Sequence, residues 1–250
     1  MNAPVERRRL PPHGQGGLSL VELLVALALS LFLIAGVVTM YFSSFQSYRV
    51  QQQNATLAQR ERLAATFVGS VVQSAGYFNQ PELYTRATAF PASAAFAMAG
   101  QSFVGTDAAY AGGDNDSLSL RMLPSPGDKV LNCLGKQNNT GAPQLYINTL
   151  HLDTVAQELE CMVMAPGGSS QNQPILSDVT SLNFVYGVDT DGDSSADRYL
   201  GAGAVSDWMA VRSITMTIGF ATNNAATGVG NTTGPTVFFT ASFPVRITSQ

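Results

Sequence analysis

The sequence is poor in the residues that carry enzyme chemistry and nucleic acid binding. Among 250 residues there are two histidines, two cysteines and one tryptophan. Charged residues make up 12% of the chain, and 13 Lys and Arg against 17 Asp and Glu give a net charge of -4. The sequence contains no GxSxG, HExxH or phosphate-binding motif. It therefore predicts that the chain is not an enzyme, and so few basic residues exclude nucleic acid as an expected partner.

One long hydrophobic run stands near the start of the chain. Leu23–Phe42 contains no charged residue, and a helix of this length, at roughly 1.5 Å per residue, spans a ~30 Å hydrocarbon core. Arginines at positions 7–9 precede the run and the next basic residue is Arg49, so the positive-inside rule places the N-terminus in the cytoplasm and exports the rest. A conventional signal peptide has a shorter run followed by small residues, whereas here the glycines come first. We therefore predict a membrane helix.

Glu22 interrupts the beginning of this run. A carboxylate near the end of a membrane helix costs about 2–3 kcal/mol or more unless it is paired, which makes Glu22 a functional candidate in need of a partner. The surrounding residues, GGLSLVELLVAL from Gly16 to Leu27, resemble the type IV prepilin (class III) signal.

The prepilin resemblance implies a processing site and an assembly contact. A prepilin peptidase would cut after Gly17, so that residues 1–17 form a cleaved basic leader and Leu18 begins the mature chain. Glu22 then becomes the fifth mature residue, and it would meet the Leu18 amine, usually methylated in this family, of an adjacent subunit. The family usually has Phe or Met in place of Leu18.

The helix is predicted to continue beyond the membrane, so that residues 18–76 form one helix with a membrane half at about 18–45 and an amphipathic half at about 46–76. Apolar residues in the second half recur at steps of three, four and seven, which is typical of a helix that packs on a domain along one stripe. The stripe comprises Val50, Leu57, Ala64, Phe67, Val68, Val71 and Ala75.

Residues 77–250 are predicted to form an exported, β-rich globular domain. Prolines at 81 and 91 indicate that 77–116 is a long connection with room for one short helix. Alternating patterns bounded by Pro, Gly or Asn then predict strands at 117–123, 144–150, 159–164, 179–188, 211–222 and 236–248. Short connections favour a mainly antiparallel sheet, with Pro244 at an edge or a bulge. The predicted fold class is α+β and pilin-like, with the long helix packed on this sheet.

The two cysteines, Cys133 and Cys161, both lie in the exported part. Outside the reducing cytosol such a pair is more typical of a disulfide than of a metal site or a nucleophile. Closing a loop of about 28 residues stabilises a fold by roughly 3–4 kcal/mol in the chain-entropy model.

The sharpest local motif is the acidic segment DTDGDSSAD at 189–197. Its alternating carboxylates match the first half of an EF-hand-type loop, with Gly192 at the tight turn, which predicts a Ca²⁺ site. Leu200 stands where such a loop has its bidentate acid. The alternative is an acidic Asx-rich turn that water solvates. The candidate ligands are Asp189, Asp191, Asp193, Ser195 and Asp197.

The signal, the helix and a cysteine-bearing β domain that carries YGVDTDGDSSADRYL together resemble the PilW-type minor pilins of type IV pili. The resemblance implies a subunit that takes part in pilus assembly and priming and in motility or adhesion. Its expected partners are minor and major pilins, the prepilin peptidase, the inner-membrane assembly platform and a tip adhesin. It would lie in the inner membrane with a periplasmic domain, and then in the pilus. The alternatives are a minor pseudopilin of a type II secretion system and a membrane-anchored, calcium-dependent adhesion module.

Overall fold

The computed structural model describes residues 19–107, 115–165, 167–223 and 233–245. The predicted leader, the cleavage residues Gly17 and Leu18, and the end of the last predicted strand lie outside these ranges. Contacts divide the chain into two units, Met1–Gln51 and Gln52–Gln250, which are described separately.

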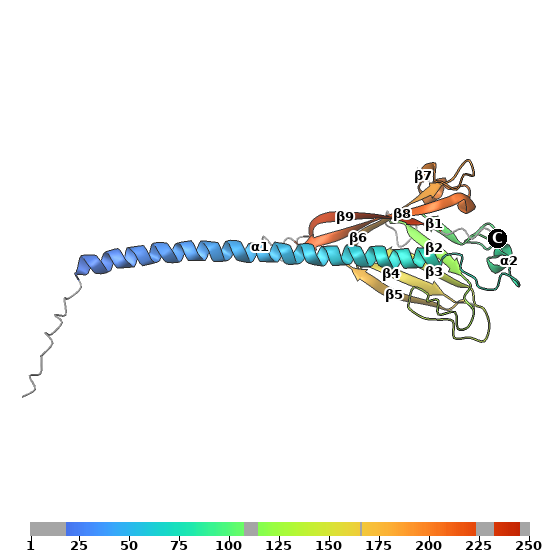
Figure 1. Cartoon of the computed structure of the whole chain (residues 1–250), viewed down its shortest axis with the longest axis horizontal. Helices are drawn as coiled ribbons and strands as arrows, with labels where there is room; N and C mark the ends of the chain where they lie inside the picture. The colour runs from blue at the N-terminus through green and yellow to red at the C-terminus, as the bar shows by residue number, and fades with distance from the viewer. Residues whose placement is uncertain (1–18, 108–114, 166, 224–232, 246–250) are drawn as a thin grey trace, which may run out of the picture. The chain divides into compact units, whose positions relative to one another are not determined.

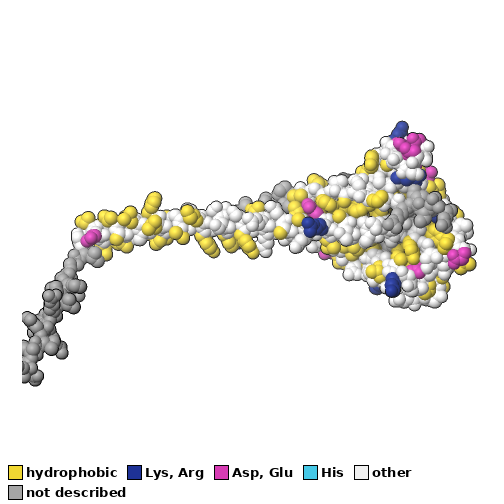
Figure 2. Space-filling view, viewed as in Figure 1, with side chains coloured by type: hydrophobic (Ala, Val, Ile, Leu, Met, Phe, Trp, Pro, Cys, Tyr) yellow, Lys and Arg dark blue, Asp and Glu magenta, His cyan; other side chains and the backbone are white. Residues whose placement is uncertain are grey.

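The first unit contains the beginning of helix α1, Leu20–Ser74, which confirms the predicted long helix. Its large hydrophobic side chains are exposed, and Figure 2 shows them along the face in view. Polar hydroxyls within the run are satisfied by the helix itself, because Ser30 donates to the carbonyl of Leu27 at 2.9 Å and Thr39 to that of Gly36 at 2.8 Å. Among the described residues, α1 is the one helix long and apolar enough to cross a membrane.

In the second unit, α1 packs on the β domain along one stripe. Leu57 and Phe67 are half-buried against the core, and five residues are fully buried there: Ala64, Val68, Val71, Val72 and Ala75. The predicted stripe is confirmed apart from Val50, which is 54% exposed. An ion pair between Arg60 and Asp178 at 2.5 Å also ties the helix to the domain.

The strands form two antiparallel sheets rather than the single sheet expected (Figure 1). The five-stranded sheet has the order β1-β2-β3-β4-β5, with β1 at Phe103–Thr106, β2 at Ser117–Met122, β3 at Tyr146–Asp153, β4 at Glu158–Met164 and β5 at Ser170–Ser177. The four-stranded sheet has the order β7-β6-β8-β9, with β6 at Val179–Val188, β7 at Arg198–Leu200, β8 at Val211–Asn223 and β9 at Thr233–Pro244.

All six predicted strands are present, and the described residues form three further strands that were not predicted. β1 and β7 have four and three residues, too few to show an alternating pattern, and β5 is polar and contains Pro174. Pro244 ends β9, an edge strand, as predicted.

One hydrophobic core joins α1 to both sheets. Alternate residues of the strands supply it: Leu118, Leu120, Leu150, Leu152 and Leu159 from one sheet, and Leu182, Phe184, Ile214, Met216, Ile218 and Phe220 from the other. The predicted disulfide is confirmed, with Cys133 bonded to Cys161 on β4 and their Cα atoms 6.2 Å apart.

The connection between α1 and the sheets contains the expected short helix, α2 at Arg86–Ala89, and is organised around a buried arginine. Arg121 of β2 is 1% exposed. Its guanidinium donates to the carbonyls of Phe90, Pro91 and Gln101. The group also lies 4.1 Å from the centre of the Phe96 ring. Burial lowers the pKa of Arg121 to about 10, so it stays charged at neutral pH and holds the connection on the sheet.

Candidate functional sites: the assembly helix and the acidic loop

Glu22 lies in the first turn of α1, where the helix dipole favours a negative charge. Its side chain is exposed, and none of the described residues forms an ion pair with it. Leu18, the predicted partner residue, lies outside the described ranges. The pairing of Glu22 with a neighbouring Leu18 amine therefore stays a prediction.

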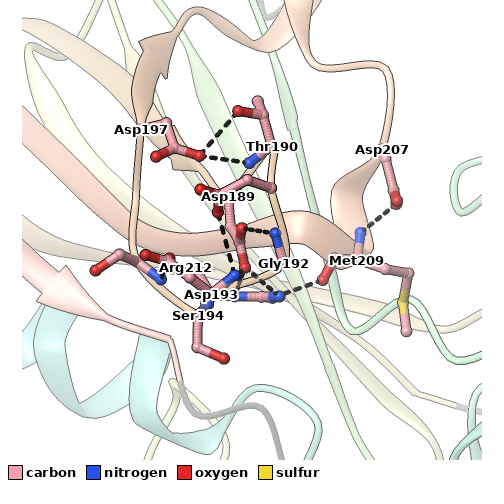
Figure 3. Close-up of polar contacts among 11 residues, drawn as sticks. Asp189, Thr190, Gly192, Asp193, Ser194, Asp197, Asp207, Met209 and Arg212 are labelled. Atoms are coloured by element: carbon pink, nitrogen blue, oxygen red, sulfur yellow. Dashed lines mark hydrogen bonds and ion pairs between the residues drawn. The ribbon is translucent and has the colours of Figure 1, made fainter.

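The acidic loop connects β6 to β7 (Figure 3). Two backbone bonds fix its ends: the Asp189 N–H donates to the carbonyl of Ala210 and the Asp197 N–H donates to that of Val188, both at 2.9 Å. Gly192 has a φ of +84°, in agreement with the tight turn expected there, and Ser194 also adopts a positive φ of 72°.

Asp189 is the buried anchor of the loop, with a side chain that is 1% exposed. Its carboxylate accepts N–H bonds from Gly192 at 2.7 Å and Ser194 at 3.0 Å. Arg212 of β8 adds two contacts, Nε at 3.0 Å and Nη2 at 2.8 Å, and its Nη1 donates to the Met209 carbonyl. Burial by itself would raise the pKa of Asp189, but the backbone bonds and the guanidinium together lower it.

The other acids of the loop are exposed and bond locally. Asp197 accepts from the backbone N–H of Thr190 at 2.7 Å and from its hydroxyl at 2.8 Å, and these bonds lower the pKa of Asp197. Asp191 accepts from the N–H of Asp193 at 3.2 Å, and Asp193 accepts from that of Ser195 at 2.7 Å. Such Asx-type bonds shape the loop without help from any other element.

Three of the four predicted aspartates come together as a possible metal site. Asp189, Asp191 and Asp197 can each supply one carboxylate oxygen, and these oxygens lie within 4.8 Å of one another. Such an oxygen set could hold a hard cation. Asp193 is not part of this group. Arg212 was missed by sequence reasoning, because nothing in the pattern of β8 indicates which arginine reaches the loop.

Comparison with known protein families supplies the identity. Residues 12–38 match the prokaryotic N-terminal methylation motif. Residues 135–242 match the family described as type IV pilus-assembly protein W, or PilW. Together the two matches support a PilW-type pilus-assembly protein with an N-terminal methylation motif. The PilW match includes Cys161, the acidic loop, and strands β6 and β8. No curated protein sequence matches the chain.

The two matches support a minor pilin that takes part in type IV pilus assembly, a structural protein and not an enzyme. The PilW match favours a pilus over a secretion pseudopilus. The methylation motif and the apolar helix indicate the inner membrane or the pilus as its location. Pilins and the prepilin peptidase follow as its classes of partner.

Proposed function

We propose that this minor pilin primes pilus assembly from the inner membrane, within a complex of minor pilins at the pilus tip. Prepilin peptidase removes residues 1–17, and the β domain stays on the periplasmic side until assembly carries it to the cell surface. The observation that supports this best is an exposed apolar helix with an acid, Glu22, in its first turn that has no ion-pair partner among the described residues. The freed Leu18 amine of a neighbouring subunit would neutralise that acid.

The proposed complex includes minor and major pilins and the inner-membrane assembly platform, and its position at the tip would allow contact with an adhesin. Pilus-dependent motility and adhesion then depend on this chain through the number of pili that form.

A deletion of the gene tests this function. The deletion strain should show few or no surface pili by electron microscopy and should not twitch, and the wild-type gene should restore both. Type II secretion, measured in the same strain, should be unchanged. Normal piliation in the deletion strain would contradict the proposal.

We further infer that the acidic loop binds Ca²⁺. Support comes from the convergence of Asp189, Asp191 and Asp197 and from the positive φ of Gly192 and Ser194, which turns the chain back on itself. Arg212 already neutralises Asp189, so the loop has less charge to offer a cation. We therefore expect the weak affinity of extracellular sites, with a Kd of about 10⁻⁴–10⁻³ M.

Calcium should stabilise the wild-type chain against heat, by about 1.4 kcal/mol when the free ion is at about ten times its Kd. Asp191→Ala should remove this gain. Asp193→Ala is the matched control. Asp191 and Asp193 each accept one hydrogen bond from the backbone N–H of the residue two positions later. Only Asp191 belongs to the three aspartates whose carboxylate oxygens come together. Thermal melting in calcium and in chelator measures the difference. Equal melting of the wild type in both conditions would exclude the site.

A further inference from the structure

The described residues form four edge strands, and three of these carry features that block further strand pairing. β1 has four residues and β7 has three. β5 contains Pro174, and its register with β4 shifts between Leu159 and Glu160. Short strands, prolines and bulges are the usual protection of a sheet edge against another chain.

In β9 these protections are confined to the ends of the strand. Pro235 and Pro244 lie near its two ends, and its register with β8 shifts between Ala221 and Asn223. Between them, residues 236–243 (TVFFTASF) include no proline and no charged residue, and they pair with β8 in unbroken register from Ala221↔Thr236 to Ser213↔Pro244. Within the described part of the chain, β8 is the one strand that pairs with β9. The edge therefore presents a long, neutral row of backbone N–H and C=O groups.

The hydrophobic core is incompletely covered along β9. On the inner face of the sheet, Met216 and Ile218 of β8 are fully buried. Their partners across the ladder, Ala241 and Phe239, are only half-buried. Figure 2 shows hydrophobic side chains at the surface where β9 lies in Figure 1. One more strand with apolar residues on this side would remove the remaining apolar surface from water.

The outer face of β9 is uncharged and rich in hydroxyl groups. Thr240 bonds to Thr217 at 3.2 Å and Ser242 bonds to Thr215 at 2.8 Å across the ladder, and Phe238 is 62% exposed. A strand added at this edge would meet apolar side chains on one face and neutral polar or aromatic ones on the other.

We propose that β9 binds an extended strand of a different pilin subunit, which adds to the four-stranded sheet next to β9. The strand would alternate apolar residues, facing Phe239 and Ala241, with uncharged residues beside Thr240; a charge on the apolar side would be buried without a partner. This inference rests on the proposed function as a pilin.

A second copy of this chain fits the edge less well. If two copies of β9 pair edge to edge with their inner faces on the same side of the joined sheet, a twofold axis perpendicular to the sheet relates them. The two strands are then antiparallel. In Figure 1, β9 and the part of α1 after Gln52 run in roughly the same direction. The twofold axis therefore reverses this part of α1 between the copies, whereas helices that enter one membrane from the same side run parallel.

A photo-crosslinking amino acid placed at Phe238 of the full chain, in cells that assemble pili, tests the contact. We expect an adduct with another pilin, identified by mass spectrometry. The same group at Gln171, exposed on the β5 edge, is the matched control and should give no such adduct. An adduct to a second copy, an adduct within the chain, no adduct, or the same adduct from Gln171 would each overturn the proposal.

Ala241→Lys tests the consequence for assembly. The lysine can reach water in the free domain, but an added strand would bury its charge, so we expect piliation to fall roughly tenfold or more and the Phe238 adduct to disappear. Gln173→Lys on β5 should have no effect. If Ala241→Lys melts at a lower temperature than the wild type, Phe238→Asp tests the same edge at an exposed position. Normal piliation in both β9 variants, with piliation lost in Glu22→Ala, would overturn this inference and leave the proposed function standing.

Discussion

Glu22→Ala is expected to abolish the assembly of pili without affecting folding of the β domain. The acid is exposed in the first turn of α1, at the start of an exposed apolar run. Without it, the Leu18 amine of a neighbouring subunit would enter the apolar core of the polymer unpaired, at a cost of about 2–3 kcal/mol or more. That cost corresponds to a loss of roughly 30–150-fold in the assembly equilibrium. Surface pili counted in the complemented deletion strain measure the effect.

Glu61→Ala is the matched control for this experiment, because Glu61 is a carboxylate of the same helix that lies in the second unit, beyond the apolar run. It should assemble as the wild type does. Immunoblots should show that Glu22→Ala is made and loses its leader, so that the defect falls on assembly and not on processing. Wild-type piliation with Glu22→Ala would show that the acid is not the assembly contact.

Arg121→Met is expected to destabilise the β domain by about 3–5 kcal/mol, a large part of the roughly 5–15 kcal/mol that holds a typical domain. The guanidinium is buried and serves the carbonyls of Phe90, Pro91 and Gln101, each of which costs about 1–3 kcal/mol when it loses its donor in the interior. Arg121→Lys should recover little, because a single ammonium cannot reach all three carbonyls in one plane.

Trp208 provides the measurement for the Arg121 variants. Its ring packs edge-to-face on Tyr186, with centroids 4.8 Å apart, so its fluorescence reports unfolding of the domain. The full chain in detergent should melt about 10 °C lower with Arg121→Met. Arg198→Met, at an exposed arginine on β7, should melt with the wild type. Equal melting of the Arg121 and Arg198 variants would show that the buried guanidinium contributes little.

The acidic loop separates what the local sequence predicts from what it does not. Four aspartates and a glycine in nine residues were enough to predict the turn, because Asx-type bonds and the positive φ at Gly192 arise between neighbours in the chain. The sequence could not show that Asp193 is left out of the convergent group. Nor could it show that Arg212, which reaches the loop from β8, neutralises Asp189.

By itself, the sequence determined the long helix, its apolar and amphipathic halves, the six strands with an alternating pattern and the disulfide. The helix and these strands follow from periodic patterns among residues close together in the sequence. The disulfide follows because the exported part contains only two cysteines. The tertiary structure alone decided the division into two sheets, the three short or irregular strands, the burial of Arg121 beneath the connection, and the position of β9 at the edge of its sheet. These depend on which segments meet across long sequence separations, where packing and hydrogen-bond satisfaction outweigh local preference.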